Sequence, residues 1–396
     1  MRIFKALLIL VMVSIVAVAA SAAYITQVLD PNDLKPTLIE TAKKQQISLK
    51  LDGNITWTFW PWFEITVENV QANSANWIFE ADRLEGSLSI LSILSDTIVI
   101  DELTAISPKV RFDQSKSSNT DSPAKEFSKI STRAVLIRQL TIQSGAIEGL
   151  YSGLTLNRLN LSVDSLSPAT ASRLELETYI EWDEKQAPLK INAQIIPTAT
   201  LDGLTIRDLE LQSRNLNLDY AGYLSASKSG QFSGEGQLSV AELSLRQWLR
   251  ASNFAVPKTN ALDRFDHFQL NTGLKASNDL VSLRPFALVL DETSIDGRVD
   301  LQLNPLNIDL ELLADTLNLD HYLTSESDAS SGQFDLSPVL LGTYKIDLGT
   351  LIVNQHELTN VGVDLGIGTD EITLGRLDAN LFGGELRAAG THLIAP

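Results

Sequence analysis

Apolar and polar residues alternate along most of the chain after residue 46. The clearest runs contain Leu159, Leu161 and Val163; Leu204 and Ile206; Val299, Leu301 and Leu303; Ile308, Leu310 and Leu312; Tyr344, Ile346 and Leu348; and Val361, Val363, Leu365 and Ile367. Successive side chains of a strand point to opposite faces, so this alternation predicts antiparallel strands with one apolar face and one wet face. The body of the chain is therefore predicted to be mainly β.

Helical spacing of apolar residues is confined to short stretches. Asp30-Pro31-Asn32-Asp33 offers an N-cap for a helix over residues 34–46. Residues 87–95 and 243–251 carry Leu, Ile or Trp at helical spacing and predict two further short helices. Turn-forming pairs are expected to end strands at Asp202-Gly203, Asp296-Gly297 and Asn304-Pro305.

So little helix leaves the apolar face of the sheet in need of another cover. Another sheet, the same sheet curled on itself, or a ligand could provide it. A closed sandwich or barrel is one interpretation, and an open curved sheet with an apolar lining is the other. Composition does not separate the two.

The N-terminus carries a long uncharged segment. Arg2 and Lys5 precede residues 6–29, which contain no charged residue and are long enough as a helix to cross a hydrocarbon core of about 30 Å. Its anchoring positions are Ala6, Leu7, Leu8, Ile9, Leu10, Val11, Ile15, Val16 and Val18. The alternative is a cleaved signal peptide, because Ala20-Ser21-Ala22 and Ser21-Ala22-Ala23 offer small-residue cleavage sites.

Both interpretations of this segment put the body on the same side of the membrane. Basic residues at the N-terminus hold that end in the cytoplasm, so everything after Leu29 is expected to cross the membrane. The body is therefore expected to be extracytoplasmic, which in a bacterium means periplasmic, and an uncleaved anchor would make the protein single-pass.

Composition suggests where the body divides. Residues 113–128 are rich in Ser, Asn, Thr, Asp and Lys and predict an exposed linker, and a second division is expected near 250–260. The predicted regions are an anchor (1–29), an N-terminal region (30–112), the polar linker (113–128), a β-groove region (129–257) and a C-terminal β region (258–396).

The charge of the chain excludes two classes of partner. Asp and Glu number 49 against 31 Lys and Arg, a net charge of −18. Nucleic-acid binding requires clustered basic residues, and so does electrostatic adhesion to anionic lipid. The chain has no Cys, so disulfides, thiolate metal sites and cysteine nucleophiles are excluded.

Catalytic and metal-binding patterns are missing from the sequence. The four histidines stand apart from one another, at His267, His321, His356 and His392. No serine-nucleophile elbow, phosphate-binding glycine loop or calcium loop is present. We therefore expect no catalytic residue, no metal and no cofactor, and predict that the protein is not an enzyme; a periplasmic hydrolase is a distant alternative.

Aromatic residues cluster in one short stretch. Trp57, Phe59, Trp60, Trp62 and Phe63 surround Pro61. Such density suits the membrane interface, where an apolar ring and a polar edge are both satisfied. The alternation of these residues suits packing in a strand core as well, and the core interpretation is favoured.

Several segments resemble one known family. The anchor followed by Leu29-Asp30-Pro31-Asn32-Asp33-Leu34-Lys35-Pro36, and Leu51-Asp52-Gly53-Asn54-Ile55-Thr56-Trp57 leading into Trp60-Pro61-Trp62-Phe63, are similar to the opening of AsmA-family proteins. Later segments fit in the expected order, ending with Leu377-Asp378-Ala379-Asn380-Leu381-Phe382-Gly383-Gly384. The motif positions are Asp30, Pro31, Asp33, Gly53, Trp60, Pro61, Trp62, Gly383 and Gly384. Longer members continue beyond the last pair, so the sequence is either a short paralogue or a fragment.

The resemblance implies a fold and a function. AsmA-like proteins are anchored in the inner membrane, begin with a chorein-like region, and form an elongated, curled antiparallel β-sheet with a taco-like groove. The groove is thought to carry phospholipid towards the outer membrane, and the family is also linked to outer-membrane protein assembly. A structural or adaptor protein that contacts outer-membrane assembly components is therefore the alternative function.

The alternating runs supply the candidate lining of such a groove. These residues are Leu301, Leu303, Ile308, Leu310, Leu312, Ile346, Leu348, Val363 and Leu365. Every second side chain would face a lipid tail and the others would face water. Periodicity alone does not say which face of the sheet is inside.

Overall fold

The structure is a computed structural model of the chain. It describes residues 30–44, 47–58, 63–74, 77–88, 97–112, 134–151, 153–182, 185–200, 202–227, 231–323, 341–369 and 371–394. The predicted anchor (1–29) and the predicted linker (113–128) lie outside these ranges. Within them, no helix combines the length and the apolar character needed to span a bilayer.

The chain forms two compact units, Met1–Glu184 and Lys185–Pro396. The predicted division near 250–260 falls on a helix and the segment after it, inside the second unit. In the N-terminal unit the elements are η1 (Pro31–Leu34), α2 (Lys35–Lys44), β1 (Ser48–Leu51), β2 (Ile55–Thr58), β3 (Phe63–Asn73), β4 (Trp77–Leu88), β5 (Thr97–Ile106), β6 (Lys109–Phe112), β7 (Ala134–Tyr151), β8 (Leu154–Leu166) and β9 (Ser172–Trp182).

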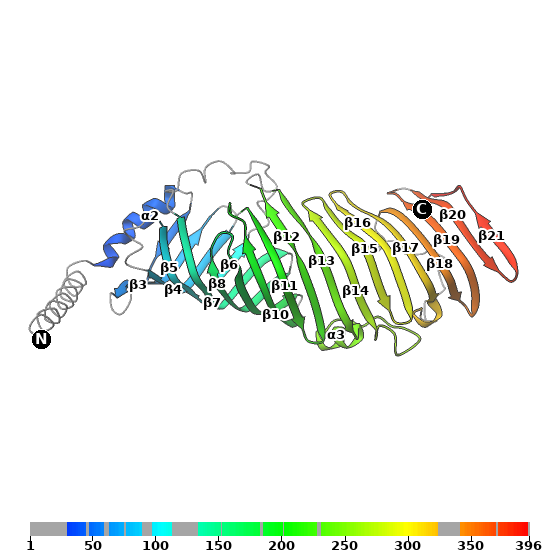
Figure 1. Cartoon of the computed structure of the whole chain (residues 1–396), viewed down its shortest axis with the longest axis horizontal. Coiled ribbons are helices and arrows are strands. Elements are labelled where there is room, and N and C mark those ends of the chain that lie inside the picture. Colours follow the sequence, from blue (N-terminus) through cyan, green and yellow to red (C-terminus); the bar gives the residue numbers. More distant parts are fainter. Residues whose placement is uncertain are drawn as a thin grey trace, which may run out of the picture. The chain divides into compact units, whose positions relative to one another are not determined.

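The C-terminal unit continues with long strands (Figure 1). Its elements are β10 (Lys185–Pro197), β11 (Gly203–Ser213), β12 (Leu216–Ala226), β13 (Phe232–Leu243), α3 (Leu245–Ala251), β14 (Phe268–Ser277), β15 (Leu280–Leu290), β16 (Thr293–Leu303), β17 (Leu306–Asn318), η4 (Leu319–His321), β18 (Gly342–Val353), β19 (His356–Ile367), β20 (Glu371–Leu381), β21 (Gly384–Ala388) and β22 (Thr391–Ile394).

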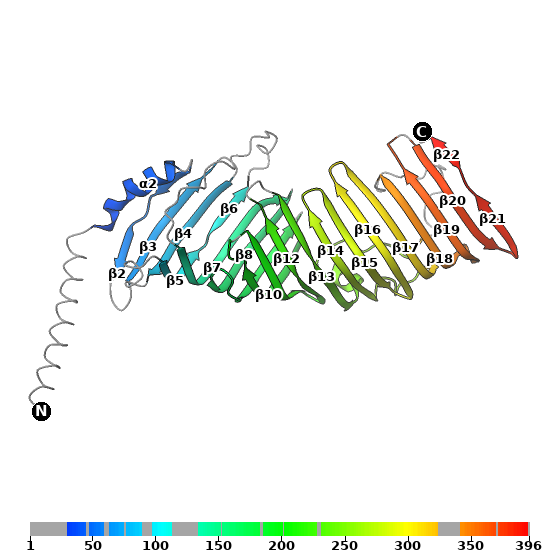
Figure 2. The same cartoon turned by 45° about the horizontal axis from the view of Figure 1, so that its top comes forward.

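Each unit is a single sheet whose strands follow chain order closely. In the N-terminal unit β1 and β2 both pair with β3, and β7 runs parallel to β5 and β6; the other pairs are antiparallel. In the C-terminal unit β10 to β20 pair in sequence, with one parallel pair, β17 with β18 (Figure 2). Both β21 and β22 pair with β20. The prediction of a mainly β body with few short helices is confirmed.

Each sheet is one layer thick in the described residues. The extensive contacts between elements are those of neighbouring strands, of α2 with β1 and η1, of η1 with β2, and of η4 with β18. Side chains therefore pack mainly against their neighbours on the same face. One buried cluster of this kind joins Ala314, Leu348, Val361 and Ala379 in the C-terminal unit, and another joins Leu51, Ile55 and Val70 in the N-terminal unit.

Bulges lie where an extra residue interrupts the alternation of apolar and polar side chains along a strand. Asp208 has a φ of 49° where the β11 register shifts between Ile206 and Leu209, and Arg158 has a φ of 53° at a shift in β8. An extra residue of this kind bends a strand and increases its local twist. The bulges keep apolar residues on one face, because Ile206 and Leu209, three residues apart, both point the same way.

The helix predictions are confirmed at two of three places. Helix α2 lies within the predicted 34–46, preceded by η1, whose N-cap Asp30 accepts a hydrogen bond from the Asn32 backbone N–H. Helix α3 lies within the predicted 243–251. The predicted helix at 87–95 is wrong where it is described: Ser87 and Leu88 end β4, because they pair with β3. Residues 89–96 lie outside the described ranges.

One predicted turn is a strand in the structure. Asn304-Pro305 joins β16 to β17 as predicted, whereas Asp296-Gly297 lies inside β16. Ile295 and Val299 keep the alternation going on both sides of Gly297, which pairs with Leu312. The local turn signal of Asp-Gly is overridden by the pairing of the flanking residues.

Candidate functional site

Apolar residues form an unbroken row across the C-terminal sheet. Residues directly opposite each other on neighbouring strands have side chains on the same face. Following these pairs from β10 to β20 gives Ile195, Ile206, Gly222, Gly236, Leu274, Leu283, Val299, Leu310, Tyr344, Leu365 and Leu374. The row contains no charged side chain. We call the face that carries it the apolar face.

The neighbouring row, on the other side of the same sheet, is polar. From β11 to β20 it reads Thr205, Tyr223, Glu235, Lys275, Ser282, Asp300, Asp309, Thr343, Gly366 and Thr373. We call this side the polar face. The register therefore sorts the alternating sequence into one apolar and one wet surface over the whole unit.

The N-terminal unit has the same two surfaces. Its apolar row is Trp57, Ile65, Gly86, Leu103, Leu140, Val163 and Leu174, and its polar row is Thr56, Thr66, Glu85, Thr104, Thr141, Ser162 and Glu175. Trp57 and Phe63 of the aromatic cluster are half-buried on β2 and β3. The rest of that cluster, residues 59–62, lies outside the described ranges.

All nine candidate groove residues lie on the apolar face. Direct pairs join Leu301 to Ile308, Leu312 to Ile346, and Ile346 to Val363. The others, Leu303, Leu310, Leu348 and Leu365, belong to the same rows of paired residues. The structure thus brings the candidates together on one surface, a property that the sequence alone left open.

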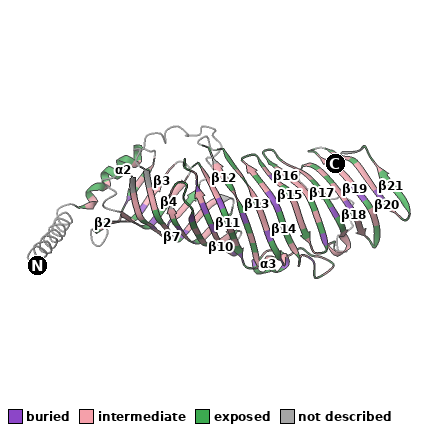
Figure 3. Ribbon diagram, in the orientation of Figure 1, coloured by how far each residue is buried: buried purple, intermediate pink, exposed green. Residues whose placement is uncertain are grey.

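The apolar face keeps part of its surface in contact with solvent. Of the nine candidates Leu348 is buried and Leu303 is exposed, and the others are half-buried. Figure 3 shows that intermediate burial predominates along the strands of this unit, with few fully buried positions. A layer packed on the face would bury such residues completely. The described residues provide no such layer.

Two buried threonines on the apolar faces are hydrogen-bonded to backbone carbonyls. Thr272 and Thr178, 3% exposed each, donate their hydroxyl protons to the carbonyl oxygens of Pro285 (2.8 Å) and Asn157 (2.9 Å). Both carbonyls lie at bulges, where the ladder leaves an acceptor without its usual partner. The threonines satisfy these acceptors and present their methyl groups to the face.

Tyr220 lies across two paired glycines on the apolar face. A Cβ atom at Gly222 would be 2.6 Å from the Tyr220 ring, and one at Gly236 would be 2.7 Å from it. The ring therefore occupies the space that side chains at these positions would fill. Burial, with the charge of Glu235 adding to it, raises the pKa of the Tyr220 phenol. The hydroxyl donates to the Glu235 carbonyl oxygen at 3.3 Å.

The polar face is organised by ion pairs between strands. Arg298 on β16 lies 2.9 Å from Glu311 and 3.3 Å from Asp309, both on β17. Hydrogen bonding to Glu311 raises the pKa of Arg298. Charge pairing of this kind keeps the polar face hydrated.

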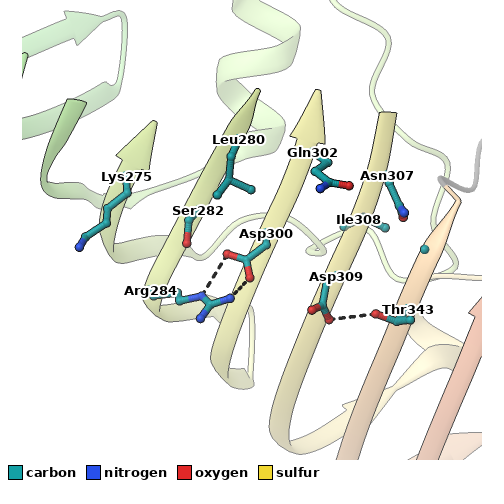
Figure 4. Close-up of a pocket in the computed structure, with 11 residues that line it drawn as sticks. Lys275, Leu280, Ser282, Arg284, Asp300, Gln302, Asn307, Ile308, Asp309 and Thr343 are labelled. Atoms are coloured by element: carbon teal, nitrogen blue, oxygen red, sulfur yellow. Dashed lines mark hydrogen bonds and ion pairs between the residues drawn. The ribbon is translucent and has the colours of Figure 1, made fainter. Parts of the chain in front are cut away.

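A hollow of about 770 Å³ lies on the polar face over β14 to β18 (Figure 4). Arg284 contacts Asp300 across it, with 3.0 Å between Nε and Oδ1, and Thr343 donates to Asp309 at 2.9 Å. Six of the eleven lining residues carry a charge or a hydroxyl group. An acyl chain placed here would leave those groups without water, so the hollow is unsuited to lipid tails.

The histidines are held in separate places. His267 pairs with Glu242 at 2.7 Å, a hydrogen bond that raises the pKa of His267. His321 contacts Asn318 at 3.2 Å, and His356 lies edge-on to the Phe382 ring. The side chain of His392 lies outside the description. Within the described ranges no group of three His, Asp or Glu side chains is placed to hold a metal ion.

The described family-motif residues have structural roles. Pro31 and Asp33 lie in η1, next to Asn32, whose side-chain amide accepts from the Ile55 backbone N–H at 3.0 Å and donates to the Ile55 carbonyl at 3.3 Å. A Cβ atom at Gly53 would be 2.6 Å from the Glu68 Cβ, so only glycine fits that close approach. Gly383, with a φ of 74°, and Gly384 lie at the junction of β20 and β21. Trp60, Pro61 and Trp62 lie outside the described ranges.

A strap of residues, 244–267, runs along one end of the strands; the sequence predicts its helix but not its contacts with the sheet. It consists of α3 and the segment that follows it. Its buried Arg246 donates to the Arg264 carbonyl at 2.7 Å, and the Arg264 guanidinium pairs with Asp263 and Glu292. The sequence signal for the strap is the pair Arg246 and Arg264, which enclose a stretch without alternating apolar and polar residues.

The strap is tied to strands far apart in the sheet. Trp248 Nε1 donates to the Ser213 carbonyl at the end of β11, at 3.1 Å, and Asn260 donates to the Asp320 carbonyl in η4, at 3.0 Å. Between these points the Asp291 carboxylate accepts from the backbone N–H of Phe265 (2.9 Å) and of Asp266 (3.0 Å). The ends of β11 to β17 are thus linked by one ordered segment.

Comparison with protein families gives one match. The model of the AsmA family matches residues 1–164. Over these residues the chain is similar to the AsmA family. No curated protein and no solved structure matches the chain. The AsmA-family match ends within β8, so the C-terminal unit lies beyond it.

The N-terminal unit, which contains the matched residues, and the unit beyond it share one arrangement of faces. The apolar row from Trp57 to Leu174 begins within the matched residues, and the row from Ile195 to Leu374 lies wholly beyond them. The AsmA-family match fits a function related to the cell envelope. The repeated apolar surface is the feature from which a more specific function can be argued.

Proposed function

We propose that this chain binds phospholipid acyl chains on the apolar faces of its sheets and carries them towards the outer membrane, without catalysis. The continuous apolar row from Ile195 to Leu374 is the observation that supports the proposal. It offers lipid tails a surface free of charged groups along the whole C-terminal sheet. The polar face on the other side keeps the protein in water.

The energy of exposing a lipid tail makes such a surface useful. Each CH₂ group costs about 0.8 kcal/mol to move into water, so a tail of about sixteen carbons costs on the order of 13 kcal/mol. A half-buried apolar row lowers this cost in proportion to the tail surface that it covers. The lipid can then cross an aqueous space with its tails covered by the protein, and no chemical step is needed.

The proposal includes a location. Residues 6–29 would anchor the chain in the inner membrane with its N-terminus in the cytoplasm, and the body would lie in the periplasm. Arg2 and Lys5 before the uncharged segment support this orientation. The AsmA family match supports a place in the envelope.

Two adjacent leucines on opposite faces provide the test. Leu312 lies on the apolar face, paired with Gly297 and Ile346, whereas Leu313 lies on the polar face and is 60% exposed. The full-length chain would be purified in detergent, exchanged into buffer with fluorescent phosphatidylethanolamine, and compared as wild type, Leu312→Gln and Leu313→Gln. Leu312→Gln should reduce bound lipid several-fold, and Leu313→Gln should bind like wild type.

Controls separate loss of binding from loss of folding. Circular dichroism and urea unfolding of both variants check that the sheet is intact, and the anchor contributes equally to all three proteins. Equal lipid binding by both folded variants contradicts the proposal. A wild-type body that carries no lipid but co-purifies with outer-membrane assembly proteins supports the adaptor alternative instead.

A further inference from the structure

On β16 and β17 the exposure of apolar-face residues falls from one end of the strands to the other. At the turn that joins β16 to β17, the directly paired Leu303 and Leu306 are 42% and 50% exposed. At the opposite end of the same two strands, Thr293 is 4% and Ala314 is 5% exposed. We call the first end the turn edge and the second the strap edge.

The same gradient is present on another strand of the sheet. Phe232 opens β13 at the turn edge and is 41% exposed, whereas Leu243 closes β13 at the strap edge and is 6% exposed. Val240, one step inward, is also 6% exposed. The gradient is therefore present on β13, β16 and β17, whereas Ile195 on β10 and Ile206 on β11 are buried near the turn edge.

The polar face lacks this gradient. Val289 and Leu313 lie near the strap edge but on the polar face, and they are 37% and 60% exposed. A position near the end of a strand therefore does not by itself cause burial. Burial at the strap edge is confined to the apolar face, on the strand ends to which the strap is bonded through Ser213, Asp291 and Asp320.

We propose that phospholipids load from the turn edge, with head groups at that edge and acyl chains directed along the strands towards the strap. The proposal rests on the proposed function. On β13, β16 and β17 the apolar side chains at the turn edge still have exposed surface that a tail can cover, whereas those at the strap edge are already buried. Head groups need water, which the turn edge retains.

The dimensions of a lipid tail say how far it reaches. Half of a hydrocarbon core of about 30 Å gives roughly 15 Å for one tail, and a strand rises about 3.3 Å per residue, so a tail spans about five residues. Counted inward from Leu303, the tail ends near the paired residues Val299 and Leu310. It stops short of Thr293 and Ala314 at the strap edge.

Photo-crosslinking with two probes tests this orientation without changing the protein. The full-length chain is loaded with phosphatidylethanolamine that carries a diazirine either on the head group or at the end of one acyl chain. After irradiation, the modified residues are identified by tandem mass spectrometry. We expect most head-group crosslinks at Phe232, Leu303 and Leu306, and most tail crosslinks at Val299, Leu310 and Tyr344, which pairs with Leu310.

The outcomes distinguish the orientation from the proposed function. Tail crosslinks at the turn edge with head-group crosslinks near the strap overturn the orientation and leave lipid binding in place. Equal distributions of the two probes do the same, because they place tails across the strands. Absence of crosslinks from both probes on the apolar face overturns the proposed function and the orientation with it.

Discussion

The Arg376 guanidinium on β20 lies 2.6 Å from the Asp347 carboxylate on β18, although β19 runs between the two strands. The residue opposite Asp347 on β19 is Gly362, where a Cβ atom would be 2.7 Å from the guanidinium. The glycine leaves the space through which the arginine reaches. Because Arg376 also lies 3.1 Å from Asp364, one cation links three strands on the polar face.

Replacement of Arg376 by glutamine should lower the free energy of unfolding by about 0.5–1 kcal/mol, because half-exposed ion pairs contribute little. The carboxylates of Asp347 and Asp364 then lose their common cation and repel each other. The loss should shrink in 0.5 M salt, since screening weakens both attraction and repulsion. Urea unfolding at two salt concentrations measures it.

Arg387→Gln is the matched control. Its partner Glu385 lies on the same strand, and the Arg387 side chain is 71% exposed, so its removal should leave the unfolding midpoint unchanged. An equal loss for Arg376→Gln and Arg387→Gln, or a loss for Arg376→Gln that salt does not change, contradicts the three-strand role of Arg376.

Valine in place of Gly236 should destabilise the C-terminal sheet by about 1–3 kcal/mol, a usual cost of overpacking. A Cβ atom there would be 2.7 Å from the Tyr220 ring and 2.5 Å from the Ala221 carbonyl oxygen, which is backbone and cannot move aside. Thermal unfolding followed by circular dichroism measures the change.

Gly366→Val provides the comparison on the polar face. A Cβ atom at Gly366 would lie 3.8 Å from the nearest Thr373 atom, an ordinary contact distance. Valine favours strands over glycine, so Gly366→Val should be neutral or stabilising. Similar losses at Gly236 and Gly366 would show that a general intolerance of valine, and not the Tyr220 ring, sets the effect.

The sequence predicts the kind of structure because the alternation is strong and local. Runs such as Val299, Leu301 and Leu303 fix the face of each strand by themselves, since one apolar surface must avoid water. The three-residue spacing from Ile206 to Leu209 also marks a bulge. A search for strict two-residue alternation would take this spacing as the end of the strand. These features depend only on neighbouring residues.

The arrangement of the candidate site depends on pairs that are distant in the sequence. Whether Leu312 and Val363 share a face is decided by the register of β17 with β18 and of β18 with β19, which periodicity does not contain. The turn predicted at Asp296-Gly297 was wrong for the same reason, because partner strands override a local signal. The strap is held by Asp291, whose hydrogen bonds reach back 25 and 26 residues.

Removal of the Thr272 hydroxyl should cost about 1–2 kcal/mol of stability. Thr272→Val keeps the shape of the side chain but leaves the Pro285 carbonyl oxygen without its 2.8 Å hydrogen bond at a site where Thr272 is 3% exposed. A buried polar group left unsatisfied costs more than the bond itself contributes. Urea unfolding gives the difference in free energy.

The polar face again supplies the control for this substitution. Thr205→Val changes the same atoms on β11, where Thr205 pairs with Tyr223 on the wet surface, and should change stability by less than about 0.5 kcal/mol. If the free energy of unfolding falls equally in both variants, the loss comes from replacing threonine by valine in a strand. It then does not come from the unsatisfied carbonyl oxygen at the bulge.

Acid should release the strap from the sheet. Burial on its own would raise the pKa of Asp291, but hydrogen bonds from the Phe265 N–H, the Tyr322 hydroxyl, and the N–H groups of His267 and Asp266 together lower it. A lowered folded-state pKa means that this contribution to stability is complete above the unfolded value of about 3.9 and is lost as pH falls through the lower folded value.

Hydrogen exchange read by mass spectrometry tests this between pH 6 and pH 3, after correction for intrinsic exchange rates. Peptides covering 260–267 should lose protection below about pH 4, while β14, which follows them, should keep its protection. Asp291→Asn suits the left-handed backbone at this position (φ of 52°) and keeps an acceptor oxygen without the charge. It should remove the pH dependence and leave the strap partly exposed to exchange at pH 6. A strap that loses protection in acid equally in wild type and in Asp291→Asn contradicts the role of Asp291.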